Sequence, residues 1–144
     1  MKIRAARRND LSAIKILLTE SGLPASDVVA TLLDDFMVAE DEGGKLVGCV
    51  GLERLGRFAL LRSLVVARST RNQRLSSTLL ARVELTAQML GVREVWLLTT
   101  TAAGLFQRYG YADADRGTAP GEVQASAQFA ELCPASAICM KKVL

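Results

Sequence analysis

The chain has 144 residues, half of them apolar, and its 18 basic and 15 acidic residues leave a net charge of +3. This length suits one domain, residues 1–144, and the scattered basic residues give little reason to expect a nucleic-acid partner. No apolar run reaches the length of a membrane span and the N-terminus does not resemble a signal peptide, so we expect a cytoplasmic protein without a membrane partner.

Histidine is absent from the sequence, which excludes several kinds of active site. There can be no Ser-His-Asp or Cys-His catalytic group and no HExxH zinc site, so acid–base chemistry must come from other side chains or from water. The three cysteines, Cys49, Cys133 and Cys139, form no CxxC pair. Three thiolates could hold a soft trivalent ion, but buried free cysteine is the favoured interpretation, and we expect no metal.

The first half of the chain alternates between apolar runs and polar turns. Its apolar runs predict strands over four ranges: 1–6, 36–39, 45–53 and 58–66. Asn9 or Asp10 can cap a helix between the first two strands. Ser26 or Asp27 can cap a second helix that continues to Leu33.

The second half of the chain adds two helices and three strands. They are expected in this order: a helix over 76–90, a strand over 93–100, a short helix over 102–109, a strand from Tyr111 and a closing strand over 136–143. Residues 118–131 are expected to form a loop with a short helix. The whole order predicts an α/β (α+β) fold, with a mixed central sheet of six to seven strands and helices on both faces.

A polar segment separates the strand over 58–66 from the helix that begins near Ser76. It carries Arg68, Arg71 and Arg74. A helix N-terminus offers N–H groups and a partial positive charge, so a loop ahead of it is a suitable seat for a pyrophosphate. The segment is equally compatible with a solvated connection that bears ordinary surface arginines, and the residues alone leave both interpretations open.

Several stretches of the chain match a known family pattern. They are VGCVGLE (47–53), LLRSLVVARSTRNQRLSS (60–77), the helix up to Leu90-Gly91, VWLLTT (95–100) and LFQRYGY (105–111). Along almost its whole length the chain resembles the GNAT superfamily of N-acetyltransferases. The resemblance implies the GNAT fold, acetyl-CoA as co-substrate and transfer of an acetyl group to an amine.

The resemblance also assigns the cofactor-binding residues, which are the end of a strand, the pyrophosphate loop and a later aromatic position. These are Leu64, Val65, Val66, Arg71, Asn72, Gln73, Arg74, Leu75, Ser76, Ser77 and Phe106. Three of them depart from the family pattern: Arg74 and Ser76 replace loop glycines, and Phe106 replaces the tyrosine that often acts as general acid. Glycine is favoured in such a loop because the backbone must approach the phosphates closely. An arginine at position 74 could block the loop or, if it points outward, bind a phosphate.

Two charged residues on the paired strands are the candidate catalytic and substrate-binding groups. Glu53 is the candidate general base, acting through water. Alternatively, Glu53 pairs with a nearby arginine: Arg54, Arg57 or Arg62. Arg62, beside Ser63, interrupts an apolar strand, where an arginine is costly unless a carboxylate or phosphate meets it. The carboxylate of an amino-acid substrate would satisfy Arg62, and so would a structural salt bridge, for example with Glu53.

The expected function follows from the resemblance. The stretches LLRSLVVA, LLTTTA and QFAELCPASAICMKK look like small GNAT proteins from arsenic-resistance gene clusters. This implies a small-molecule primary amine as acceptor, with amino-acid-like toxins as the narrower expectation. Two alternatives stay open: a degenerate GNAT fold that binds a ligand or partner without catalysis, and an acetyltransferase for protein amines. A homodimer is compatible with the sequence.

Overall fold

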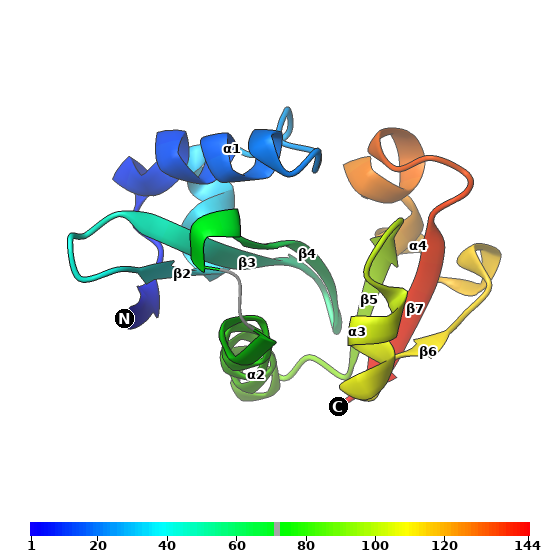
Figure 1. The fold of residues 1–144 in the computed structure, drawn as a ribbon. Helices are drawn as coiled ribbons and strands as arrows, with labels where there is room; N and C mark the ends of the chain where they lie inside the picture. Colours follow the sequence, from blue (N-terminus) through cyan, green and yellow to red (C-terminus); the bar gives the residue numbers. More distant parts are fainter. Residues whose placement is uncertain (71–72) are drawn as a thin grey trace.

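The computed structural model describes residues 1–70 and 73–144. Over these residues the chain forms a mixed seven-stranded sheet in the order β1-β2-β3-β4-β5-β7-β6 (Figure 1). The strands are β1 (Lys2–Ala5), β2 (Phe36–Glu40), β3 (Leu46–Leu55), β4 (Phe58–Val66), β5 (Glu94–Thr99), β6 (Ala112–Asp113) and β7 (Ile138–Val143). Neighbouring strands pair antiparallel except β4 and β5, which run parallel. The predicted mixed α/β sheet is confirmed.

Helices cover both faces of the sheet. The α-helices are α1 (Leu11–Glu20), α2 (Gln73–Met89), α3 (Ala103–Arg108) and α4 (Gly121–Gln124). Shorter helical turns are η1 (Arg8–Asp10), η2 (Ala30–Asp35), η3 (Arg68–Thr70), η4 (Arg116–Thr118) and η5 (Gln128–Leu132). Figure 1 shows α1 on one face of the sheet and α2 on the other. The segment 118–131, expected to be a loop with a short helix, contains α4 and most of η5.

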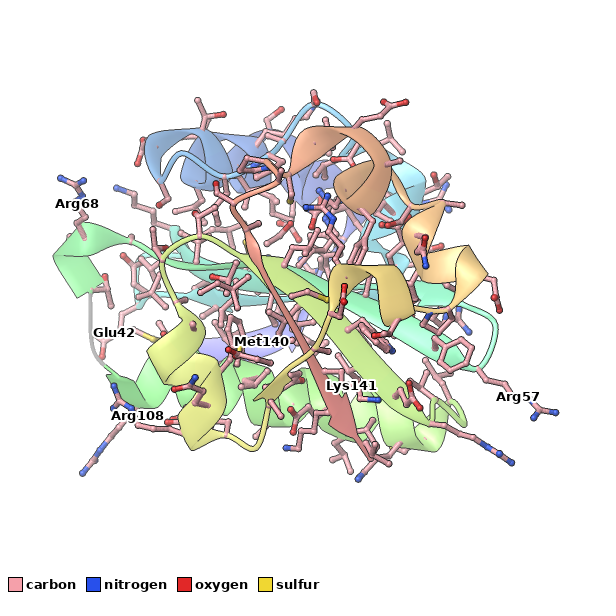
Figure 2. All side chains as sticks on the ribbon, turned by 90° about the vertical axis from the view of Figure 1, so that its right-hand side faces the viewer. Glu42, Arg57, Arg68, Arg108, Met140 and Lys141 are labelled. Atoms are coloured by element: carbon pink, nitrogen blue, oxygen red, sulfur yellow. The ribbon has the colours of Figure 1, made fainter. Side chains whose placement is uncertain are left out.

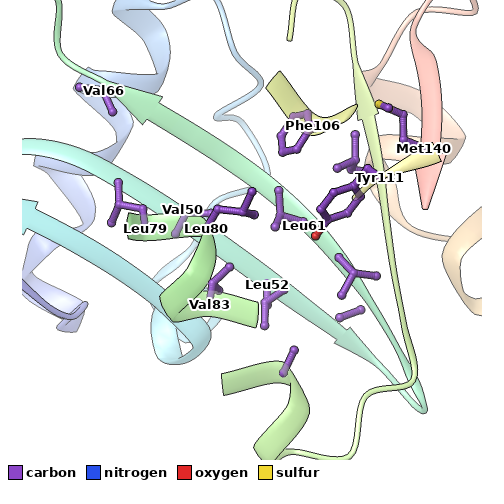
Figure 3. Packing of buried hydrophobic residues seen from close by; sticks show 14 of the residues in the cluster. Val50, Leu52, Leu61, Val66, Leu79, Leu80, Val83, Phe106, Tyr111 and Met140 are labelled. Atoms are coloured by element: carbon purple, nitrogen blue, oxygen red, sulfur yellow. The ribbon is translucent and has the colours of Figure 1, made fainter. Parts of the chain in front are cut away.

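The main apolar core lies between the sheet and α2. Side chains from β3, β4 and α2 interdigitate there (Figure 3): Val50, Leu52, Leu61, Leu79, Leu80 and Val83. The four-residue spacing of Leu79, Val83 and Ala87 places them on one side of α2. β3 and β4 are almost continuously apolar because helices cover both of their faces.

Gly51 of β3 lies close to the ring of Phe36. A Cβ atom at position 51 would overlap the ring atoms of Phe36, so only glycine lets this ring pack against the strand. Gly51 is also the residue that pairs with Arg62 of β4. Phe36 therefore packs against β3 at the residue that pairs with Arg62, a predicted site residue.

Two helix boundaries differ from the sequence-based expectations. No helix starts at Ser26 or Asp27; these residues form a turn, and regular helical structure begins only with η2. The Asp27 carboxylate binds Arg62 instead of capping a helix. The second difference is that α2 begins at Gln73 and not near Ser76. The residues between these two positions therefore belong to the first turn of the helix and not to a loop.

Candidate active site

A cavity of about 970 Å³ opens where β4 and β5 separate. The two strands pair only over residues 58–60 and 94–96. Beyond this pairing, residues 61–66 of β4 and 97–102 form facing walls. Further lining residues come from α2 and α3 on one face of the sheet, and from the segments 21–26 and 128–134 on the other. The cavity therefore passes through the sheet.

β4 contains a bulge in the wall of this cavity. Ser63 and Leu64 both lie opposite a single residue of β3, Val50. The φ of Ser63 is 61°, a value that residues other than glycine rarely adopt. The thiol of Cys49 donates a hydrogen bond to the Ser63 carbonyl at 3.2 Å. The bulge takes backbone groups out of the regular ladder at the point where Ser63 and Leu64 line the cavity.

The structure brings part of the predicted cofactor site together. Five of the predicted residues line the cavity: Leu64, Val65, Val66, Ser76 and Phe106. Arg74 is exposed in the first turn of α2, whereas Leu75 is buried in the core. Ser77 lines a smaller hollow beside α2. Gln73 is described only as the first helical residue of α2, and Arg71 and Asn72 lie outside the described residues.

The N-terminal end of α2 meets the cavity at Ser76. The first turn of a helix carries unpaired N–H groups and a partial positive charge, both of which favour an anionic ligand. Arg74 is exposed in this turn, so its positive charge is available to an anion. Arg68, also exposed, extends outward in η3 (Figure 2). This end of the cavity can hold a phosphorylated group.

Arg62 is buried on the face of the sheet opposite to α2. Its Nη1 and Nη2 atoms donate hydrogen bonds to the two carboxylate oxygens of Asp27, at 2.5 and 2.7 Å. Its Nε donates to Ser63 Oγ at 3.1 Å. The exposed fraction of the Arg62 side chain is 0%, so its guanidinium is not presented to the cavity. The structural salt bridge is thus formed, with Asp27 as the main partner; Glu53 Oε2, the expected partner, lies 3.6 Å from Nη1.

Asp27 is a site residue that the sequence analysis considered only as a helix cap. It lies in the turn between α1 and η2, 35 positions before Arg62. Hydrogen bonds from the Arg62 guanidinium hold the pKa of the Asp27 carboxyl below its usual value, although burial opposes them. The sequence did signal that Arg62 needs a counter-charge. Nothing in it indicates which carboxylate supplies one.

Glu53 stands beside this ion pair. Its Oε2 atom is buried and has no hydrogen-bond partner among the described residues. The 3.6 Å contact with Arg62 is too long for a hydrogen bond. Of the other predicted partners, Arg54 pairs instead with Asp35, at 2.8 Å. Buried acceptors of this kind usually bind ordered water. The role of Glu53 as a base acting through water stays a prediction.

Residues 128–134 close the cavity on the face opposite to α2. Those that line it are Gln128, Leu132, Cys133 and Pro134. Arg116 holds this segment by donating hydrogen bonds to the carbonyls of Phe129, Cys133 and Pro134. Burial raises the pKa of the Cys133 thiol, and the positive charge of Arg116 opposes this rise. No local pattern predicts this wall, because residues 118–131 have no clear periodicity.

Comparison with known proteins decides the family. The acetyltransferase (GNAT) domain profile matches residues 33–113. An uncharacterized N-acetyltransferase of Chlorobaculum tepidum is 31% identical over 129 residues, which cover 84% of this chain and 81% of the relative. The chain belongs to the GNAT family of acetyltransferases. The predicted family, and with it an acyltransferase, is confirmed.

Solved structures of GNAT proteins share the fold. Rv2747 of Mycobacterium tuberculosis, in complex with CoA and NLQ, has a TM-score of 0.84 and 23% identity, covering 100% of this chain and 99% of that one. N-acetylglutamate synthase of Neisseria gonorrhoeae, complexed with coenzyme A and N-acetyl-glutamate, has a TM-score of 0.84 and 20% identity over 99% of this chain and 35% of that one. The PaiA N-acetyltransferase of Thermoplasma acidophilum, in complex with coenzyme A, has a TM-score of 0.69 and 16% identity, covering 99% and 98%.

This GNAT chain has no tyrosine in the described cavity wall. Phe106 lies there instead and makes an edge contact with Tyr111, their ring centroids 5.5 Å apart. The Tyr111 hydroxyl donates a hydrogen bond to Glu84 at 2.8 Å, and burial raises its pKa above the usual range. Tyr109 lines the smaller hollow beside α2. Neither tyrosine is therefore placed to take over the role of the family's general acid.

The GNAT chain shows neither a metal cluster nor a membrane-spanning helix among the residues that the structure describes. Among residues 1–70 and 73–144, no three Cys, Asp or Glu side chains come together in a way that could hold a metal ion. Within the same residues, no helix has the length and apolar character needed to cross a bilayer.

Proposed function

We propose that this GNAT protein transfers the acetyl group of acetyl-CoA to the primary amine of a small molecule. The observation that carries the proposal is the cavity through the separated strands, with the β4 bulge in its wall. One end meets the N-terminus of α2, and the other lies between the segments 21–26 and 128–134. Two reactants can enter from opposite faces and meet at the bulge. Three of the similar structures are complexes with coenzyme A, which supports the choice of donor.

The residues that replace the loop glycines are compatible with such a donor. Ser76 is small and lines the cavity, and Arg74 is exposed. Neither adds a bulky side chain to the described wall, and the arginine adds a positive charge where phosphates would bind. Acetyl-CoA would supply the reactive thioester. The chain would hold this thioester at the bulge in an orientation that the amine can attack.

Acetyl transfer requires two kinds of group from the chain: a hydrogen-bond donor for the thioester oxygen and a base for the amine. Attack by the amine places negative charge on the thioester oxygen, and a fixed backbone N–H lowers the energy of that charge. We assign this role to the backbone of residues 64–66, which follows the bulge. The attacking amine must also be neutral, so a base must accept its proton. We assign this role to Glu53, acting through water, because its Oε2 is a buried acceptor without a hydrogen-bond partner among the described residues, 3.6 Å from the Arg62 guanidinium.

An amino-acid-like toxin of the arsenic-resistance type is the narrower form of the proposal. The names NLQ and N-acetyl-glutamate in two of the similar structures support an acceptor of the amino-acid kind. Such an acceptor needs a partner for its carboxylate. Arg62, which we expected to serve, is already bound to Asp27, so the narrower form requires that pair to open.

A thiol-release assay tests the proposal. The chain is incubated with acetyl-CoA and a panel of primary amines, amino acids and polyamines, and released coenzyme A thiol is followed. We expect saturable release that depends on the chain and on the amine, with the acetylated amine identified by mass spectrometry. Binding of acetyl-CoA without transfer to any member of the panel would favour the alternative of a GNAT fold without catalysis.

A further inference from the structure

The described cavity wall has little free charge. Of the residues that line it, Arg62 alone is charged, and its guanidinium is covered. The polar lining on the face opposite to α2 consists of neutral side chains, among them Ser26, Ser63, Gln128 and Cys133. A carboxylate on the acceptor would therefore find only one cation in the described wall. It could reach that cation only by replacing Asp27.

The pairing of Arg62 with Asp27 has the geometry that an acceptor carboxylate would use. Both Asp27 oxygens accept from the two terminal nitrogens of the guanidinium, which is the two-point contact that arginine makes with carboxylates. Asp27 is part of the same chain, so its carboxylate competes at a high effective concentration. An acceptor carboxylate that displaced Asp27 would replace one two-point contact with Arg62 by another, so the net gain in binding free energy would be small.

The charge around the pair also disfavours a second anion. Two carboxylates, Asp27 and Glu53, lie within 2.5 and 3.6 Å of one guanidinium, Arg62. Their formal charges are −2 and +1, which leaves −1 for the cluster. An additional carboxylate at this place would be repelled, whereas an ammonium group would be attracted.

We propose that Asp27 determines acceptor specificity: it occupies the carboxylate position on Arg62 and restricts the acceptor to primary amines that carry no carboxylate beside the amine. This inference rests on the proposed function and names its substrate class. It replaces the narrower amino-acid form of that function, which would need the Arg62–Asp27 pair to open. It makes Asp27 a specificity residue and Arg62 its support. The Asp27 side chain is 21% exposed whereas that of Arg62 is 0% exposed, so solvent reaches the pair from the Asp27 side.

Matched pairs of acceptors test the proposal. Leucine is compared with isoamylamine, and glutamine with 4-aminobutanamide, because the members of each pair differ only by the carboxylate. The ratio of kcat/KM within each pair is measured for the parent chain, Asp27→Asn and Asp27→Ala. Asp35→Ala is the control, since it also removes a carboxylate that pairs with an arginine, at 2.8 Å from Arg54. Comparing each variant with the parent cancels the intrinsic difference in amine basicity.

We expect the parent to prefer the amine without a carboxylate after correction for the fraction of neutral amine. Asp27→Ala should shift the ratio toward the amino acid by about tenfold or more, because the two Arg62 donors that bind Asp27 become available for a charge-assisted contact. Asp27→Asn should give a smaller shift, since its amide oxygen still accepts from Arg62. Asp35→Ala should leave the ratio unchanged. An unchanged ratio in folded Asp27→Ala, or a parent that prefers the amino acid, would overturn the proposal.

The outcome for Asp27 can be separated from that for the proposed function. Transfer to isoamylamine or any other amine supports the function, whatever the variants do. If neither the parent nor any variant transfers acetyl groups, the proposed function is wrong. The role of Asp27 in excluding a carboxylate is then tested by calorimetric titration with leucine. The proposal then requires binding by Asp27→Ala and none by the parent, and the reverse result contradicts it. Thermal denaturation reports whether Asp27→Asn and Asp27→Ala fold. If neither variant folds, the preference of the parent for the amine or for the amino acid tests the proposal.

Discussion

The ion pair between Arg62 and Asp27 determines how the charged residues of the site are arranged. An unpaired guanidinium in a buried strand would cost several kcal/mol, and Asp27 together with Ser63 satisfies three of its nitrogens. Because these donors point to Asp27, Glu53 keeps one buried oxygen that has an ion-pair contact with Arg62 but no hydrogen-bond partner among the described residues. Glu53 is thus held beside a positive charge but remains able to accept a hydrogen bond.

Replacement of Glu53 tests its role as base. Glu53→Gln should lower kcat by roughly a hundredfold or more, because the amide cannot accept the proton of the amine, while acetyl-CoA binding stays intact. Steady-state kinetics and calorimetry measure the two effects. Glu42→Gln, at an exposed position (Figure 2), is the control for loss of one carboxylate. Unchanged turnover in Glu53→Gln would assign proton removal to solvent.

The sequence indicates which buried charged residues require a counter-charge, but it does not indicate which residue supplies it. The apolar neighbours of Arg62 indicate that this arginine requires a counter-charge. The candidates near in sequence, such as Glu53, are on the adjacent strand, but the main partner comes from a turn 35 positions away. That contact depends on how the segment after α1 packs over the sheet, and no local pattern encodes it.

The segment 128–134 closes the cavity on the face opposite to α2, the face from which we propose that the acceptor enters. Its Cys133 lines the cavity, while Cys49 and Cys139 are buried in the sheet. Burial raises the pKa of Cys49 to about 12 and that of Cys139 to about 11. Thiolate is the reactive form, so these two thiols are protected both by access and by protonation.

Alkylation with iodoacetamide at mildly alkaline pH should therefore modify Cys133 first, as peptide mass spectrometry would show. We expect the modified chain to lose transfer activity by about tenfold or more, because the adduct narrows the acceptor side, yet to keep its affinity for acetyl-CoA. Cys133→Ser should be insensitive to the reagent. Full activity after complete modification of Cys133 would contradict the assignment of this wall to the acceptor.

Element boundaries show where local patterns stop being informative. The strand ranges 36–39, 45–53 and 58–66 lie close to β2, β3 and β4, because apolar runs between polar turns are strong signals. The start of α2 was predicted three residues late, because the polar residues ahead of Ser76 gave no apolar periodicity. The predicted helix after Asp27 is replaced by a turn and η2, because the tertiary contact with Arg62 overrides a capping preference.

At the scale of the whole molecule, the order of elements predicts the mixed sheet but not the cavity. The cavity exists because β4 and β5 pair over three residues and then separate, and because β4 is bulged at Ser63. Both features depend on strand pairing, which the sequence alone does not give. The family resemblance, rather than periodicity, pointed to this place in the fold.

The proposed function requires that this cavity binds acetyl-CoA although Arg74 stands where the family has glycine. Calorimetric titration of the parent chain and of Arg74→Gly with acetyl-CoA tests it most directly. Arg82→Gly, at an exposed position farther along α2, is the control for loss of charge and of helix propensity. We predict one-site binding by the parent and a modest loss, roughly two- to tenfold, in Arg74→Gly that high salt masks. No binding by the parent, with clear binding by Arg74→Gly, would contradict the proposed function.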